Sequence, residues 1–195
     1  MMNFNFNVAE LLFALPELFL LFAISLILLF DLFVSQRLKQ FTYYLTQIAL
    51  LITGFLAFNL IGENATIFSG TFVLDSLGST FKVFILGFAI IALVYTRHYL
   101  KAHELLRNEY FILAMMSILG MMVMVSGHSL LTLYLGLEIM SLSLYALIAT
   151  ARDRASAIEA ALKYFVLGAI ASGLLLYGMS MIYGISGSLD ISQIS

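Results

Sequence analysis

The sequence contains no cysteine, and only 10% of its 195 residues are charged. Without cysteine the chain can form no disulfide, no thiolate zinc site and no cysteine-held iron–sulfur cluster. The formal net charge is only −2, so a basic surface for nucleic acid is excluded as well. The histidines are few and scattered, which argues against a histidine metal site. These absences leave the chain without an evident redox or metal centre of its own.

Hydrophobic residues make up 63% of the chain, above the roughly half that is usual for a soluble domain. They form six runs close to the ~20 residues that a helix needs to cross a bilayer. Lipid cannot satisfy exposed backbone groups, so each run is predicted to be a helix. The expected fold class is an all-α polytopic membrane protein, with a single transmembrane domain over residues 1–195. The six spans are expected at about 9–34, 41–61, 76–96, 109–126, 129–150 and 157–184.

The charges between the runs predict how the helices cross the membrane. Basic residues follow the first, third and fifth runs: Arg37, Lys39, Arg97, Lys101, Arg107, Arg152 and Arg154. The alternate loops contain no lysine or arginine, and they hold Glu63, Asp75 and Asp190. By the positive-inside rule the basic loops are cytoplasmic and both ends of the chain lie outside. The first run lacks a basic leader and is too long for a cleaved signal peptide. We expect a bacterial inner membrane with periplasmic ends, and a mitochondrial inner membrane is the alternative.

Glu138 lies near the centre of the fifth run, where its side chain is too short to reach either interface. A charged group at that depth costs about 2.5–3.5 kcal/mol on insertion scales. Tyr134, Ser141 and Tyr145 fall on the same helical face, which forms a polar stripe on an otherwise apolar helix. We interpret Glu138 as part of an ion or proton path. The alternative is a protonated structural glutamate.

Two lysines also fall within the runs. Lys163 follows Glu159 by four residues, so it forms either a local helical ion pair or a protonatable group facing a hydrated interior. Ser156 and Glu159 fit a capping box at the start of the sixth helix. Lys82 is expected to extend to the membrane interface. Glu17 is expected to have an end-of-helix role.

Two long motifs resemble a known family. LGLEIMSLSLYALIA, followed by EAALKYFVLGAIASGLLLYG, and the trailing YGISGSLD are similar to the subunit N family of bacterial NADH-quinone oxidoreductase, respiratory complex I. LPELFL and LLFDLF match the first helix of that family. The resemblance covers the whole chain and is strongest from about 109 to 190. The family contains more helices than this chain, arranged as inverted repeats, so the chain is expected to be an N-terminal portion with an incomplete antiporter-like domain.

The resemblance implies a function and a site. Glu138 would be the essential mid-membrane glutamate, and Lys163 the nearby lysine whose proton affinity it tunes. Tyr134, Ser141, Tyr145, Glu159 and Lys82 are secondary candidates. The chain would contribute to proton translocation coupled to quinone reduction, with other membrane subunits of complex I and the lipid bilayer as partners. NADH, FMN, iron–sulfur clusters and quinone would belong to other subunits, so no cofactor or metal is expected in this chain.

Two other functions are compatible with the sequence. One is a cation/proton antiporter subunit of the related Mrp type, which shares the fold and the Glu–Lys pair. The other is a structural assembly subunit that does not pump, for which the charge of Glu138 would be dispensable.

Overall fold

The computed structural model describes residues 8–33, 40–103 and 105–194. Six of the helices in these ranges are long and apolar enough to cross a membrane, so the predicted number of spans is confirmed. The chain is a mainly helical, multi-pass membrane protein. Its elements are α1 (Val8–Phe13), α2 (Leu15–Phe33), α3 (Gln40–Asn59), β1 (Ala65–Ile67), η2 (Phe68–Gly70), β2 (Phe72–Leu74), α4 (Ser76–Ala102), α5 (Asn108–Ser126), α6 (Leu130–Ile148), α7 (Ala155–Ser186) and α8 (Ile191–Ile194).

Three predicted boundaries differ from the structure. The first run is divided at Ala14 into α1 and α2, because Pro16 has no N–H to continue the helical ladder. The third span continues to Ala102, so residues 97–102 are helical and not loop as predicted. No glycine or proline interrupts that stretch. The predicted cap at Ser156 is wrong: α7 starts two residues earlier than predicted, at Ala155, with Arg154 as N-cap and no side-chain capping bond.

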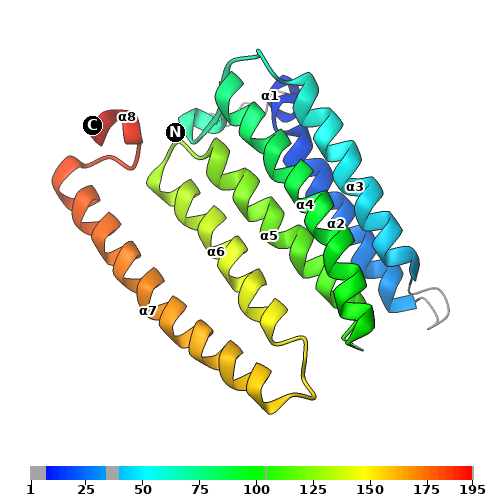
Figure 1. Cartoon of the computed structure of the whole chain (residues 1–195). Helices are drawn as coiled ribbons and strands as arrows, with labels where there is room; N and C mark the ends of the chain where they lie inside the picture. Colours follow the sequence, from blue (N-terminus) through cyan, green and yellow to red (C-terminus); the bar gives the residue numbers. More distant parts are fainter. Residues whose placement is uncertain (1–7, 34–39, 104, 195) are drawn as a thin grey trace.

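The helices α2 to α5 form a bundle (Figure 1), in which α2 and α4 each pack against both α3 and α5. Consequently α2 and α4 occupy opposite corners. Apolar side chains from all four helices fill the space between them, including Leu20, Leu50, Leu86 and Met115. Methionines of α5 contribute to this packing, and Met115 is fully buried.

Helices α6 and α7 stand beside the bundle (Figure 1). Gly120 of α5 and Gly136 of α6 bring those two helices into close contact, because a Cβ atom on either would meet the backbone of the other. By contrast α7 packs mainly on α6, and Ala161 is its single buried residue. Gly187 ends α7 with a φ of +68°, a left-handed conformation that glycine adopts without a Cβ penalty.

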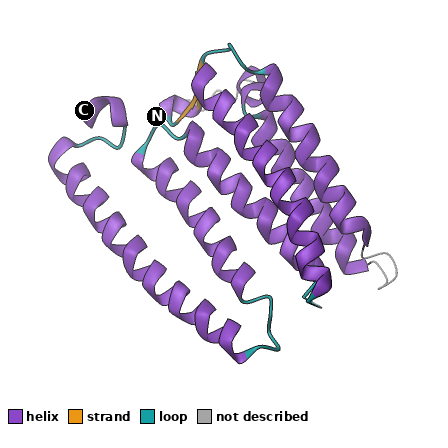
Figure 2. Ribbon diagram, viewed as in Figure 1, coloured by secondary structure: helices purple, strands orange, loops and turns teal. Residues whose placement is uncertain are grey.

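A short hairpin lies between α3 and α4 (Figure 2), which the sequence analysis did not predict. Its antiparallel strands β1 and β2 pair Ala65 with Leu74 and Ile67 with Phe72. Strands of three residues are too short to leave a periodic signal in the sequence. Ala14, Ile67 and Phe72 form a small apolar cluster that joins the hairpin to the end of α1.

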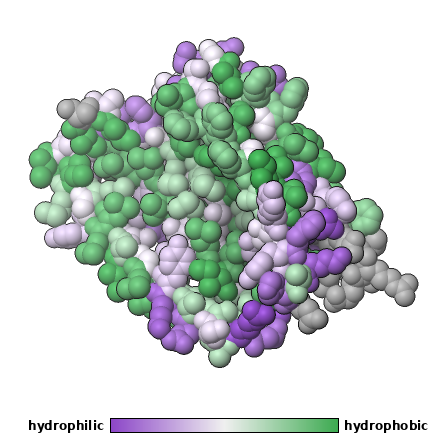
Figure 3. Space-filling model, in the orientation of Figure 1, coloured by the Kyte–Doolittle hydropathy of each residue, from purple (hydrophilic) through white to green (hydrophobic). Residues whose placement is uncertain are grey.

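The two ends of the molecule differ in charge. We call the end that carries Arg97, Lys101, Arg107, Arg152 and Arg154 the basic end, and the end that carries Glu63, Asp75 and Asp190 the acidic end. Apolar side chains cover the centre and left side of the face shown in Figure 3, and hydrophilic ones gather mainly at its bottom and lower right, with fewer at its top. Arg37 and Lys39, which the sequence also predicts to be on the basic side, lie outside the described residues. This distribution is typical of a protein that crosses a bilayer.

Candidate functional site

Glu138 lies in the middle of α6 and is half-buried. Its Oε1 atom is fully shielded and has no hydrogen-bond partner among the described residues. Tyr134, one turn earlier, is the titratable neighbour that interacts with the carboxyl group. A shielded carboxyl oxygen without a partner carries a desolvation cost of about 1–3 kcal/mol. The structure therefore agrees with the sequence that the Glu138 carboxyl group is energetically costly where it lies.

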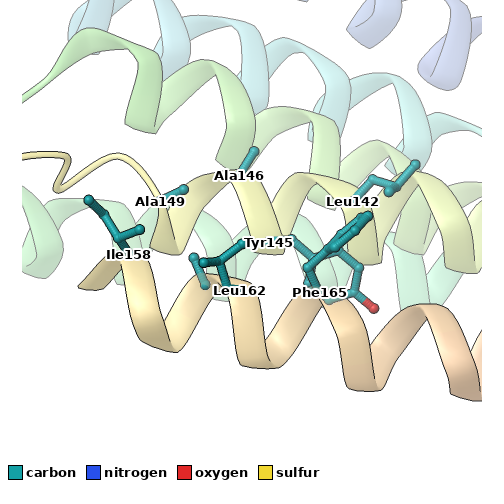
Figure 4. A pocket seen from close by; sticks show the side chains of 8 residues that line it. Leu142, Tyr145, Ala146, Ala149, Ile158, Leu162 and Phe165 are labelled. Carbon is teal, nitrogen blue, oxygen red and sulfur yellow. The ribbon is translucent and has the colours of Figure 1, made fainter. Parts of the chain in front are cut away.

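The polar stripe of α6 faces α7. Tyr134 lines a cavity of about 170 Å³ together with Met179, Ser180 and Tyr183 of α7. Tyr145, at the other end of the stripe, lines a second cavity of about 350 Å³ with Ile158 and neighbouring apolar residues of α7 (Figure 4). Along α6, Glu138 lies between Tyr134 and Tyr145, the residues that line these two cavities. Its helix face thus looks toward α7 and away from the bundle core.

Tyr145 makes the main side-chain contact between α6 and α7. Its ring lies edge-on to Tyr164, with 4.7 Å between ring centroids, and 5.8 Å from the ring of Phe165. Its hydroxyl lies against the backbone at Gly168, where no side chain could be accommodated without a shift. Of the small residues of α7, Gly168 therefore permits close contact with α6, whereas a Cβ at Gly173 would meet nothing within 4 Å.

Lys163 is paired with Glu159, not with Glu138. Lys163 Nζ lies 2.6 Å from Glu159 Oε1, and the two side chains are 70% and 66% exposed. Tyr145 packs beside this segment of α7, and it lies about two helical turns beyond Glu138. The ion pair between Lys163 and Glu159, one of the two arrangements that the sequence left open for Lys163, is therefore present. The roles of Glu138 and Lys163 in proton transfer stay predictions.

Lys82 does not extend to the interface as predicted. Its side chain is only 2% exposed, and Nζ lies 2.5 Å from Oε1 of Glu17, which is 7% exposed. The prediction was wrong because it treated each charge alone. Opposite charges near the starts of α2 and α4 were the available signal, but only the fold brings these two residues together.

The remaining polar candidates have structural partners. His128 lies in the turn before α6, where its backbone N–H donates to the carbonyl oxygen of Thr71 and its Nε2 lies 3.5 Å from Asp190. Asp31 accepts hydrogen bonds from Thr42 and Asn108 at 2.9 and 2.6 Å. Across residues 8–33, 40–103 and 105–194, no three histidine, aspartate or glutamate side chains are grouped so as to hold a metal ion.

Comparison with solved structures places this fold among the membrane subunits of respiratory complexes. Respiratory complex I from Thermus thermophilus with bound aureothin contains a similar chain, with a TM-score of 0.74 and 29% identity over 90% of this chain and 38% of that one. A membrane-bound sulfane sulfur reductase, an archaeal respiratory membrane complex, matches with the same TM-score and 25% identity, over 96% of this chain and 39% of that one. This chain therefore shares its fold with chains of these two respiratory membrane complexes.

Sequence comparison finds similar proteins in one kind of respiratory complex. A family model described as NADH:quinone oxidoreductase/Mrp antiporter, TM, matches residues 126–195. NADH-quinone oxidoreductase subunit N of Ruthia magnifica is 66% identical over 100% of this chain and 41% of that protein. The same subunit of Halorhodospira halophila is 50% identical over 98% of this chain and 40% of that protein. The chain is therefore similar over its full length to NADH-quinone oxidoreductase subunit N, and it spans about two fifths of the length of these relatives.

Proposed function

We propose that this chain takes part in proton translocation within the membrane arm of an NADH:quinone oxidoreductase, and so acts as a subunit of a translocase. The relatives at 66% and 50% identity are both named as subunit N of that complex, which supports this activity over the Mrp-type antiporter. Other membrane subunits would be its partners. The redox groups, namely NADH, FMN, iron–sulfur clusters and quinone, would belong to those other subunits.

The observation that carries the proposal is the shielded carboxyl group of Glu138. Buried carboxyl oxygens that only stabilise a fold are in most cases hydrogen-bonded, because an unpaired buried acceptor destabilises the structure. Glu138 Oε1 has no such partner among the described residues. The carboxyl group is thus able to accept a proton or pair with a cation, either of which removes the cost of its isolated charge.

The neighbours of Glu138 would support proton movement along the face of α6. Tyr134 and Tyr145 line the cavities toward α7, and their hydroxyl groups can both donate and accept hydrogen bonds. Ser141 has the same capacity one turn beyond Glu138. Lys163, held by Glu159 in the structure, would be the group whose proton affinity responds to this path.

The location proposed for this activity follows the charge distribution. Seven of the nine basic residues lie in the loops or helix ends that the sequence predicts to be on the same side of the membrane. We infer that this basic end faces the bacterial cytoplasm and that the acidic end, with both ends of the chain, faces the periplasm. Residues 1–195 would act as one transmembrane domain.

The test is substitution of Glu138 in the full-length subunit within the assembled complex. Glu138→Gln keeps the size of the side chain and removes its ability to ionise. The rate of NADH-dependent proton pumping should fall by about 10²-fold or more, since a positioned acid–base group contributes about 10²–10⁴-fold to the rate of a proton-transfer step. Glu109→Gln is the matched control, because it makes the same chemical change at an exposed glutamate that pairs with Arg152. Normal pumping by an assembled Glu138→Gln complex would contradict the proposal.

A second measurement separates the competing functions. If Glu138→Ala abolished sodium tolerance and left NADH-dependent pumping intact, the Mrp-type antiporter would be supported instead. If both activities stayed normal with the complex assembled, the chain would have a structural role only.

A further inference from the structure

A second buried charge pair lies away from Glu138, at the acidic end of the bundle. Glu17 of α2 and Lys82 of α4 are in contact at 2.5 Å, and both side chains are almost completely buried. Their helices occupy opposite corners of the bundle, so the pair crosses its interior. Burying two ions costs several kcal/mol each, and a well-packed apolar pair is often equally stable there. Stability alone therefore does not account for this pair.

Several buried polar atoms around the pair have no hydrogen-bond partner among the described residues. The second carboxyl oxygen of Glu17, Oε2, is buried without a hydrogen-bond partner among the described residues. The hydroxyl groups of Ser79 and Ser126 are buried in the same unpaired condition. Ser79 lies one turn before Lys82 on α4. Ser126 ends α5 next to Gly127, which bridges to Phe72, and the Phe72 ring lies 5.1 Å from Lys82 Nζ.

The segment from β1 to β2 contacts this pair through Phe72, and α1 packs on that segment; we call α1 together with the segment from β1 to β2 the lid. Phe72 contributes both to the lid cluster with Ala14 and Ile67 and to the cation–π contact with Lys82. The backbone N–H of Phe68 donates to Glu10 of α1 at 3.3 Å, which ties the two parts of the lid together. Phe68 and Ser69 have positive φ values of 52° and 56°, a conformation that non-glycine residues adopt at a cost.

Few other ionisable groups face the pair. The titratable residues of α3 and α5, which are tyrosines and Glu109, lie toward the basic end of those helices. At the acidic end, Glu10 accepts from Phe68 and Asp75 caps α4 through the N–H of Gly78 at 2.8 Å. The pair is therefore isolated in an apolar bundle, with unpaired hydroxyl groups nearby that suit ordered water.

We propose that Glu17 and Lys82 form a proton-exchange site beneath this lid. A hydronium ion entering from the acidic end gives its proton to Glu17, where a new O–H bond forms and water is left. The ammonium group of Lys82 has then lost its counter-charge, and burial favours release of its proton to another water: an N–H bond breaks and its electron pair stays on nitrogen. The O–H proton of Glu17 then passes to the Lys82 amine, which restores the ion pair. One proton has moved from one water to another.

This inference stands on α2, α4 and the lid, and it does not depend on the proposed role of Glu138. The test is infrared difference spectroscopy of the full-length protein in its native membrane complex, recorded between pH steps. A protonated-carboxyl C=O band should grow as the pH is lowered and be lost in Glu17→Gln. It should persist in Glu109→Gln, the control. Since Glu17→Gln leaves Lys82 as an unpaired buried charge, the double variant Glu17→Gln, Lys82→Met provides a second comparison.

The possible results are distinct. Loss of the band in the single or the double variant supports the site. An identical spectrum in the wild type and in a folded double variant shows that Glu17 never takes up a proton. This result overturns the proposal, and the ion pair then has a structural role only. Phe72→Leu should open the lid and speed the deuterium shift of the band in D₂O. An unchanged exchange rate would remove the lid from the proposal. None of these readouts depends on electron transfer or pumping.

Discussion

Gly120 of α5 and Gly136 of α6 face each other where the two helices come closest. A Cβ at Gly120 would lie 2.5 Å from the backbone nitrogen of Met140 and 2.7 Å from the carbonyl oxygen of Gly136. Backbone atoms cannot move aside as a flexible side chain can. The position of α6, and with it of Glu138, therefore depends on the absence of a side chain at these two residues.

Gly120→Ala should destabilise the protein. Better helix propensity for alanine contributes up to ~1 kcal/mol, but overpacking typically costs ~1–3 kcal/mol, so the net effect is a loss. Thermal unfolding in detergent measures the difference. Gly173→Ala is the control, because a Cβ at Gly173 meets nothing within 4 Å, and it should be neutral or slightly stabilising. Equal melting temperatures for Gly120→Ala and wild type would contradict the close approach.

Lys82→Met should destabilise the bundle more than any surface charge substitution. It leaves the Glu17 carboxylate buried without compensation, and breaking such a pair costs about 3–5 kcal/mol. The double variant Glu17→Gln, Lys82→Met should recover most of that loss, since neither charge remains. Unfolding free energies in detergent measure both. A single variant as stable as wild type would show that the pair is not formed in the membrane-embedded protein.

The segment after α7 should be sensitive to acid through Asp190. Hydrogen bonds from the side chain and backbone of Ser192 lower the pKa of Asp190, and the nearby His128 lowers this pKa further. A carboxyl group with a lowered pKa stabilises the folded segment above its unfolded pKa, and this contribution is lost as the pH falls through the folded value. Hydrogen-exchange protection of residues 188–194, corrected for intrinsic rates, should therefore drop at acidic pH.

The Asp190→Asn variant should lose that pH dependence, while Glu63→Gln, in another loop of the acidic end, should keep it. Persistence of the same acid transition in Asp190→Asn would assign it to another group.

The ion pairs at the basic end should contribute little. Arg152 lies 3.1 Å from Glu109, and Arg107 lies 2.6 Å from Asp153, but most of these side chains are solvent-exposed. Exposed pairs are worth about 0–1 kcal/mol and are screened by salt. Arg152→Gln should thus change the unfolding free energy by less than about 1 kcal/mol, and less at high salt. A larger loss would mean that the pair is shielded by lipid or by a partner.

Much of the fold could be predicted because it depends on local properties. Runs of apolar residues specify membrane helices wherever they occur, since the bilayer leaves the backbone no alternative. The positions of Glu138 and Lys163 on their helices followed from counting residues. Helix ends were less predictable: Ala102 ends α4 beyond its apolar part, and Arg154 caps α7 in place of Ser156, because polar residues at the interface can extend a helix at little cost.

By itself, the sequence determined that this chain crosses a membrane with six helices and holds a carboxyl group at the centre of one of them. Only the tertiary structure decided which charges meet. Glu17 and Lys82 are separated by 65 positions in the chain and pair in the bundle interior, whereas Lys163 pairs with Glu159 on the exposed side of α7. The reason is physical: hydropathy acts residue by residue and sets depth in the bilayer, but partner choice depends on how helices are arranged around one another, and that arrangement is set by contacts between distant segments.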